Sequence, residues 1–143
     1  MARYIVGFTG SRAGMTAAQR QRVTALLREL IARHASEALC GLHGDCLGAD
    51  ADFDAVCKQL AVRVLIRPAT IVAMRAGCDS EVIAPPKRPL ARNRDIVADS
   101  QVLIACPRGP VEVLRSGVWA TIRAMRKKGG PLHVIAPDGS TIA

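Results

Sequence analysis

Aromatic residues are scarce in this sequence, because its 143 residues include only one Trp, one Tyr and two Phe. A chain of this length forms one domain with a substantial core, and that core must be mostly aliphatic. Proteins that bind single-stranded nucleic acid normally stack the bases on aromatic side chains. The composition therefore argues against that class of binding protein.

Long hydrophobic runs, paired cysteines and repeats are also lacking. No apolar run approaches the ~20 residues that span a bilayer, and no segment has the pattern of a signal peptide, so we expect a cytoplasmic protein without a membrane partner. The five cysteines are odd in number and include no C-x-x-C pair, which favours reduced thiols over a disulfide framework. Nothing in the pattern divides residues 1–143, and we expect a single domain.

Acidic residues are outnumbered by basic ones, 12 against 20, which gives a formal charge of +8 and a pI near 10.0. This excess of positive charge indicates a polyanionic or phosphorylated partner. The alternative is a basic surface that binds nothing specifically.

Short β-rich runs alternate with amphipathic helical segments along the chain. We expect strands at about 4–8, 38–42, 61–66, 101–106 and 132–136, and helices at about 17–33, 49–60, 89–98 and around Val118, Trp119, Ile122 and Met125. Such alternation predicts an α/β, three-layer Rossmann-like domain with a mostly parallel sheet of about five strands. Residues 67–89, rich in proline, break the pattern and should form a mobile or partner-ordered loop.

The order of the strands predicts where a ligand binds. The long connection after the third strand fits a sheet in which strands one to three run outward one way and the fourth returns beside the first. Ligands in such sheets bind at the carboxyl ends of the strands, where the order reverses. The loops that contain Gly10 and Gly44, and the loop over 108–117, should all emerge there.

The stretch from His43 to Asp50 reads as a turn from a strand into a helix, and we interpret it as a binding turn. Gly44 and Gly48 let the backbone approach a ligand closely, and the helix N-terminus beyond them presents unpaired N–H groups. Asp45 lies between these glycines, where a carboxylate could accept hydrogen bonds from ribose hydroxyls. Capping of the helix by Asp45 is the alternative.

Arginines stand at three places that should reach the same end of the sheet. Arg12 follows Gly10-Ser11, Arg92 precedes Asn93 on a short helix, and Arg115 precedes Ser116-Gly117 at a helix N-terminus. An arginine there is electrostatically unfavourable unless it binds an anion. A bound phosphate would resolve the repulsion among the three guanidiniums, whereas the alternative is that each points separately into solvent.

A zinc site is the other chemistry that this region suggests, because Cys40, His43 and Cys46 are spaced three apart. Only three ligands are present, and no distant Cys/His pair completes a tetrahedron. We therefore expect no metal, and we interpret Cys46 as a small packed residue rather than a nucleophile.

Four motifs in order resemble the SLOG superfamily of Rossmann-like nucleotide-binding domains, especially its small stand-alone members from bacteria and phages. They are FTGSR at 8–12, HGDCLGAD at 43–50, RNRDIV at 92–97 and RSGVWAT at 115–121. The resemblance covers nearly the whole chain except 67–86. It implies a site for a nucleotide or nucleotide-derived ligand at Gly10, Ser11, Arg12, Gly44, Asp45, Gly48, Asp50, Arg92, Asn93, Arg115, Ser116, Gly117 and Thr121.

The resemblance also implies which branch fits less well. The phosphoribohydrolases called LONELY GUY carry a P-G-G-x-G-T-x-x-E motif whose glutamate serves catalysis, and Thr121 stands at the matching position here. A threonine cannot act as a carboxylate does. We therefore expect a sensor, carrier or sequestering protein without a cofactor, forming a homo-oligomer of two or more chains. The alternatives are an N-glycosidic hydrolase and a DNA-binding protein like DNA-processing protein A, which shares the Ser-Gly-x-x-x-Thr pattern.

Overall fold

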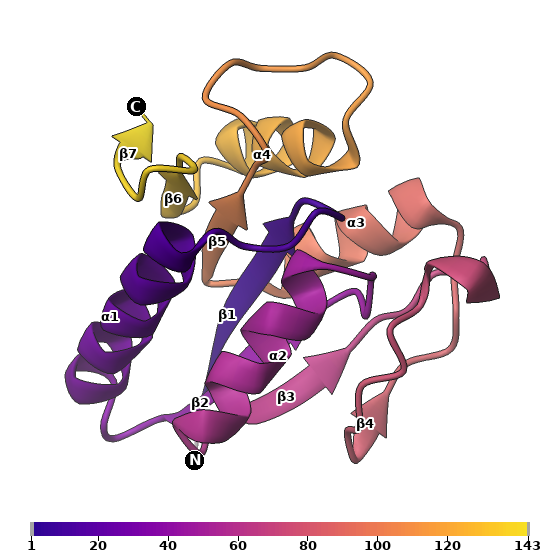
Figure 1. The fold of residues 1–143 in the computed structure, drawn as a ribbon. Helices are drawn as coiled ribbons and strands as arrows, with labels where there is room; N and C mark the ends of the chain where they lie inside the picture. The colour runs from indigo at the N-terminus through magenta and orange to yellow at the C-terminus, as the bar shows by residue number, and fades with distance from the viewer. Residues whose placement is uncertain (1, 143) are drawn as a thin grey trace.

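The computed structural model describes residues 2–142, which form one seven-stranded sheet in the order β4-β3-β2-β1-β5-β6-β7 (Figure 1). The strands are β1 (Arg3–Gly10), β2 (Ala38–His43), β3 (Arg63–Ile66), β4 (Val82–Ile83), β5 (Val102–Cys106), β6 (Leu132–Ile135) and β7 (Thr141–Ile142). The helices are α1 (Ala17–Arg33), α2 (Ala49–Gln59), α3 (Pro89–Asp99) and α4 (Gly117–Lys128), with a 3₁₀ turn, η1, at Val72–Met74. All pairs of neighbouring strands are parallel except β6 and β7.

Helices cover both faces of the sheet, which confirms the three-layer α/β prediction. Side chains of α1 and α2 pack on one face with Val6 and Phe8 of β1, while α3 and α4 contribute Ile96, Val97 and Met125 to the other face. Side chains of alternate β5 residues pack on opposite faces of the sheet, as expected for a parallel strand that is buried on both faces. The near-continuous apolar runs of the sequence have this origin.

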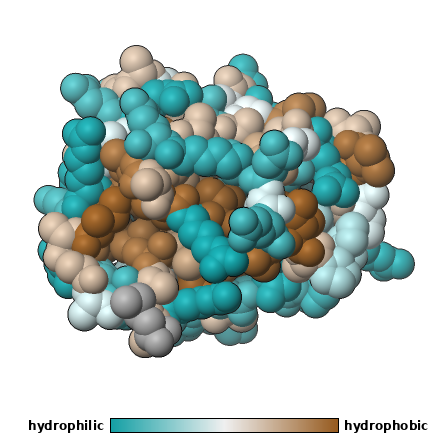
Figure 2. All heavy atoms as spheres, turned by 90° about the horizontal axis from the view of Figure 1, so that it is seen from below, coloured by the Kyte–Doolittle hydropathy of each residue, from teal (hydrophilic) through white to brown (hydrophobic). Residues whose placement is uncertain are grey.

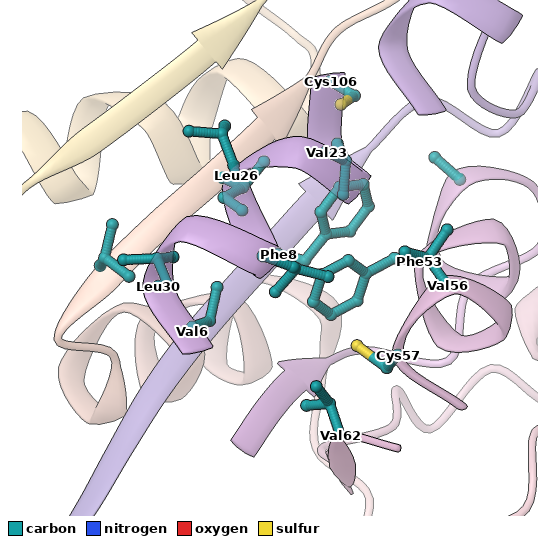
Figure 3. Packing of buried hydrophobic residues seen from close by; sticks show 14 of the residues in the cluster. Val6, Phe8, Val23, Leu26, Leu30, Phe53, Val56, Cys57, Val62 and Cys106 are labelled. Atoms are coloured by element: carbon teal, nitrogen blue, oxygen red, sulfur yellow. The ribbon is translucent and has the colours of Figure 1, made fainter. Parts of the chain in front are cut away.

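The first of these layers contains most of the few aromatic rings. Figure 3 shows Phe8 of β1 facing Phe53 of α2, with the aliphatic side chains of α1 around them. The two rings are stacked, with centroids 4.4 Å apart. Truncation of a buried Phe to Ala typically costs about 3–5 kcal/mol, so this pair is a principal support for the side of the sheet that carries α2.

Helix α1 begins where its capping signal predicts. Thr16 accepts a hydrogen bond from the Gln19 backbone N–H, and the Gln19 side chain accepts one from the Thr16 N–H, each at 3.0 Å. The buried Gln19 amide also donates to the carbonyls of Pro107 and Ile135. One residue thus caps the helix and ties its start to the carboxyl ends of β5 and β6.

The sheet has two more strands than the expected five. β4 and β7 have two residues each, too few to show a periodic pattern in the sequence. β4 lies within the segment expected to be an irregular loop, where it pairs with β3, and Ser80 donates its hydroxyl to the Val64 carbonyl at 2.6 Å. This segment therefore has regular contacts with the sheet edge, and its mobility stays a prediction.

The reversal of strand order lies between β1 and β5, as predicted. Loops after β1, β2 and β5 consequently meet at the end of the sheet shown at the top of Figure 1. The opposite side, seen from below in Figure 2, has hydrophobic side chains gathered in its middle with hydrophilic ones around and across them. No helix within residues 2–142 has the length and apolar character needed to cross a membrane.

Candidate functional site

A cleft of about 490 Å³ opens at the carboxyl ends of β1, β2 and β5. Eleven of the thirteen residues predicted for the site line it: Gly10, Ser11, Arg12, Gly44, Asp50, Arg92, Asn93, Arg115, Ser116, Gly117 and Thr121. The structure thus brings together motifs that are more than 100 residues apart in the chain. Asp45 and Gly48 are not part of the lining.

Three arginines at the mouth of the cleft have no partner within the described residues. Arg12, Arg108 and Arg115 are exposed and line the cleft from separate loop positions, and none of them makes a hydrogen bond or ion pair there. Arg108 is a site residue that the sequence analysis missed. Its position two residues beyond the end of the central strand β5 is the signal that could have identified it.

The N-terminus of α4 faces the same space. The Ser116 hydroxyl accepts the Trp119 N–H at 3.4 Å, which caps one donor of the first turn. The backbone N–H groups of Gly117 and Val118 have no acceptor within residues 2–142, and both residues line the cleft. Free donors and the positive end of the helix dipole favour an anion at this point.

The turn after β2 binds several of its donors within the protein. The Asp50 carboxylate accepts the backbone N–H groups of Gly44 and Cys46 on one oxygen, Oδ2, at 3.2 and 3.1 Å. The first N–H of α2, that of Ala49, is bound to the Ser11 carbonyl at 2.9 Å. These three N–H groups are therefore satisfied by the protein itself, whereas those of Asp50 and Ala51 in the first turn of α2 have no acceptor within residues 2–142.

Asp50 itself is only 5% exposed, yet it lines the cleft. Burial raises the pKa of its carboxyl above the ordinary value, against the opposing effects of His43, Arg92 and the backbone hydrogen bonds. It is the only carboxylate among the residues that line the cleft. Four arginines share that lining, so the cleft as a whole is cationic.

The role expected for Asp45 needs correction. Its carboxylate is 1% exposed and accepts the backbone N–H groups of Gly77 and Cys78 at 3.2 and 2.9 Å, with the Arg75 guanidinium 3.6 Å away. Both oxygens therefore hold the 75–78 segment rather than face a ribose. The sequence pattern could not show this, because the partners lie more than 30 residues ahead.

Gly48 is also a packing residue rather than a lining residue. Its φ is +91°, and a Cβ atom there would lie 2.2 Å from the carbonyl oxygen of Arg12. The glycine lets the turn after β2 lie directly against the loop after β1. It shapes the cleft without reaching it.

Arg92 is buried, and most of its guanidinium N–H groups donate hydrogen bonds within the protein. It donates to Asn93 Oδ1 through Nε at 2.7 Å and to the Gly44 carbonyl through Nη1 at 2.8 Å, and Nη2 lies 3.4 Å from the Cys46 sulfur. A Cβ on Gly44 would lie 2.2 Å from Nη1, so the glycine makes room for the guanidinium. Arg92 anchors the turn, and its contact with phosphate stays a prediction.

The hydroxyls of the remaining predicted residues are engaged locally. Ser11 Oγ accepts the Ala13 N–H at 3.1 Å, and Thr121 donates its hydroxyl to the Gly117 carbonyl at 2.9 Å. Gly10 allows the end of β1 to approach α2, because a Cβ there would lie 2.4 Å from the Ala49 methyl. Thr121 lines the cleft at the position where the phosphoribohydrolase motif has its glutamate, and it brings no carboxylate.

Potential metal ligands gather elsewhere. Within residues 2–142 the only group of three is His43, Asp54 and Cys78, whose ligand atoms lie within 4.8 Å of one another. His43 Nδ1 accepts the Asp45 N–H, so its Nε2 carries the hydrogen that is donated to Asp54 at 2.8 Å. Both ring nitrogens of His43 are therefore engaged in hydrogen bonds within the protein. Burial and Asp45 raise the pKa of Cys78 to about 12.

The Cys46 thiol has a shifted pKa as well. Its pKa is raised by burial first and by the Asp50 carboxylate second, while Arg92 opposes them. Cys46 lines the cleft, and a raised pKa disfavours the thiolate that a nucleophilic cysteine needs.

Comparison with solved structures identifies the fold. The molybdenum cofactor binding protein from Rippkaea orientalis superposes with a TM-score of 0.71 at 19% identity, over 94% of this chain and 77% of that one. The molybdenum cofactor carrier protein from Chlamydomonas reinhardtii gives 0.65 at 19% identity, over 93% and 76%. DNA processing protein A from Streptococcus pneumoniae gives 0.69 at 17% identity, and this chain spans half the length of that protein.

The chain shares the Rossmann-like α/β fold of these solved structures. No family model and no curated protein sequence matches the chain, so the likeness lies in the backbone. Two of these neighbours are named for the molybdenum cofactor and one for DNA processing. The cleft described above lies at the end of the sheet where ligands bind in such folds.

Proposed function

We propose that this protein binds a nucleotide or nucleotide-derived small molecule in the carboxyl-end cleft, as a sensor, carrier or sequestering protein. The observation that supports it most is the convergence of Arg12, Arg108 and Arg115 without a carboxylate partner in the described chain. Like charges gathered around one space repel, and a bound phosphate turns this repulsion into charge-assisted hydrogen bonds. The two free N–H groups of α4 would add to that grip.

The size and walls of the cleft favour more than a bare phosphate. Small-molecule pockets usually have volumes of about 300–1,000 Å³, and this cleft has about 490 Å³. Apolar side chains of Phe8, Ile96, Val118 and Trp119 contribute to its lining. A ligand with a ring system beside its phosphate would use both kinds of surface.

Hydrolysis of an N-glycosidic bond has less support. The position of the family glutamate is occupied by Thr121, whose hydroxyl hydrogen is donated to a backbone carbonyl. We therefore expect no release of free base from a nucleoside 5′-monophosphate above background. Base release that disappears in Asp50→Asn would instead identify a hydrolase with a relocated carboxylate.

DNA binding is the second candidate, and the charge of +8 together with the exposed arginines favours it. A distributed phosphate footprint makes affinity fall steeply with salt, by roughly one power of the salt concentration for each phosphate neutralised. A ligand held inside a cleft by two or three arginines should show a much smaller salt slope.

Thermal unfolding with a panel of AMP, ADP-ribose, cyclic AMP and a single-stranded oligonucleotide tests these proposals. A ligand that binds only the folded state stabilises it by about 2.7 kcal/mol at a hundredfold excess over its dissociation constant. We expect a higher melting temperature with at least one nucleotide, and native mass spectrometry of freshly purified protein should show a co-purifying ligand. A panel that produces no shift at millimolar concentration contradicts the binding function.

A further inference from the structure

Asp50 combines two features within the cationic cleft. It is a carboxylate, and it is nine-tenths or more buried while lining the cleft. Arg12, Arg108 and Arg115 would bind an anion without it, and any second anionic group near it would be repelled. Its presence therefore restricts what the cleft accepts.

The Asp50 carboxylate is rigidly placed by the turn around it. The N–H groups of Gly44 and Cys46 both point to Oδ2, and the side chain arises from the first turn of α2. A carboxylate offers about four lone-pair sites, so two backbone donors on one oxygen leave acceptor capacity for a ligand. A pre-oriented acceptor of this kind loses little entropy when it binds.

The neighbouring groups do not neutralise Asp50 directly. No arginine or lysine nitrogen within residues 2–142 lies within ion-pair distance of its oxygens. Arg92 lies close to the same turn but donates to the Gly44 and Arg67 carbonyls and to Asn93. The Cys46 thiol also makes a side-chain hydrogen bond with the Asp50 carboxylate, and the acceptor capacity that then remains is available to the cleft.

From this geometry we infer that Asp50 determines specificity, by accepting hydrogen bonds from hydroxyl or amino groups of a ligand whose phosphate lies at the arginines and the α4 N-terminus. The inference rests on the proposed function and names the ligand class: a phosphorylated molecule with hydrogen-bond donors, such as a ribonucleotide, rather than an inorganic polyanion. Asp50 takes over the role that the sequence had suggested for Asp45.

Calorimetric titration of wild type and Asp50→Asn with AMP and with inorganic pyrophosphate tests this assignment. An amide keeps the shape and can still accept from Gly44 and Cys46, but the charge is lost. We expect Asp50→Asn to weaken AMP binding by about ten- to a hundredfold, as loss of a hydrogen bond to a charged group does. Pyrophosphate binding should stay the same or become tighter, because a nearby negative charge is removed.

Asp52→Asn is the matched control, since it makes the same charge change two residues away. Asp52 accepts from the Met15 N–H and pairs with Arg20, outside the cleft lining, so its AMP affinity should equal that of wild type. An Asp50→Asn variant that binds AMP like wild type, or that weakens both probes equally, overturns the assignment. Pyrophosphate binding without AMP binding overturns it too, while binding of neither probe to wild type overturns the proposed function as well.

Wild-type protein alone provides an independent measurement if Asp50→Asn does not fold. AMP lacking both ribose hydroxyls and AMP lacking the exocyclic amine each remove donors from the ligand. At least one of them should bind about tenfold more weakly than AMP. Equal affinities for all three ligands would overturn the inference without touching the arginine site.

Discussion

Two strand-to-helix connections face the same cleft, and they differ in which of their donors and charged groups are bound within the protein. The turn between β2 and α2 is closed: its N–H groups at Gly44, Cys46 and Ala49 are bound to Asp50 and to the Ser11 carbonyl. The loop between β5 and α4 is open, because Arg108 and Arg115 are exposed and the N–H groups of Gly117 and Val118 have no acceptor within residues 2–142. In Figure 1 this loop arches above α4.

The comparison shows that a glycine-rich turn at a helix N-terminus is not by itself an anion site. Each helix start has orphan donors, and a chain can satisfy them with a carboxylate of its own or leave them to a ligand. Here the closed turn positions a hydrogen-bond acceptor, and the open loop provides the positive charge. A ligand would therefore lie between the two connections with its phosphate on the α4 side.

The largest effect should come from the glycines of the two connections. Gly48→Ala combines a positive φ with a Cβ 2.2 Å from the Arg12 carbonyl oxygen, which should destabilise the fold by roughly 2–6 kcal/mol through strain and overpacking. Gly117→Ala meets only the Asn93 amide, 3.9 Å away, and should be neutral or stabilising by up to about 1 kcal/mol. Urea unfolding of both variants measures the contrast, and equal stabilities would contradict the distinction between a closed turn and an open loop.

Arg115→Ala tests the open loop by affinity. Loss of charge-assisted hydrogen bonds should weaken AMP binding by roughly 1.5–3 kcal/mol, about ten- to a hundredfold. The apo protein should become no less stable, because a cation opposed to the α4 dipole is removed.

Arg28→Ala is the control for that titration, since Arg28 is exposed on α1 and makes the same change in net charge. Its AMP affinity should match wild type. Calorimetry at two salt concentrations also tests nucleic-acid binding. A modest loss of affinity in Arg115→Ala, together with a steep dependence of affinity on salt, would favour distributed binding to a nucleic acid. Unchanged affinity in Arg115→Ala removes the main support for the cleft as an anion site.

Asp45→Asn tests the closed turn by stability. One carboxylate oxygen that accepts the Gly77 or Cys78 N–H becomes a donor, and a buried N–H loses its partner. The free energy of unfolding should fall by about 1–3 kcal/mol, and amide exchange at residues 76–78 should become faster. AMP affinity should change less than twofold, and a larger loss would restore Asp45 as a ligand contact.

The smallest effect concerns the pH dependence of stability. Asp50 and Asp54 lie one turn apart on α2, and their pKa values are shifted in opposite directions. Burial opposes ionisation of Asp54, but hydrogen bonds from His43 and Lys58 outweigh it and hold its pKa below the ordinary value. Its contribution to stability is therefore present above the unfolded pKa of about 3.9 and lost as the pH falls through the folded one. Asp50, with its pKa raised by burial, begins to cost stability as the pH rises above the unfolded value of about 3.9, and the cost is complete above its folded value.

Melting temperatures of the apo protein across an acid-to-neutral series measure both signs. Asp54→Asn should show a shallower loss of stability on acidification than wild type. The melting temperature of Asp50→Asn relative to wild type should instead become more favourable as the pH rises. Parallel profiles for the two variants would contradict the opposite environments of these carboxylates.

Local patterns in the sequence were sufficient to predict the architecture. The capping spacing of Thr16 and Gln19 and the apolar face that follows define α1, which has the bounds that were predicted. The alternation of apolar runs and amphipathic segments predicts a doubly covered parallel sheet, because each element must bury its own apolar face. Only β4 and β7, two residues each, were beyond this reasoning.

The sequence also determined which end of the molecule carries the cleft. Connections in such sheets are right-handed and ligands bind where the strand order reverses, so motifs near Gly10, Gly44 and Arg115 had to meet. Eleven of thirteen predicted residues line one cleft for this reason.

Only the tertiary structure decided what each of those residues does. Asp45 and Asp50 look equivalent in the chain, but the partners of Asp45 come from residues 77 and 78, whereas Asp50 folds back on its own turn and faces the cleft. Arg92 and Arg115 look equivalent in the chain too, but Arg92 donates to the Gly44 carbonyl, whereas Arg115 has no hydrogen bond or ion pair with any residue from 2 to 142. Contacts between segments that are distant in the sequence decide which donors remain free. A local sequence pattern cannot predict such contacts.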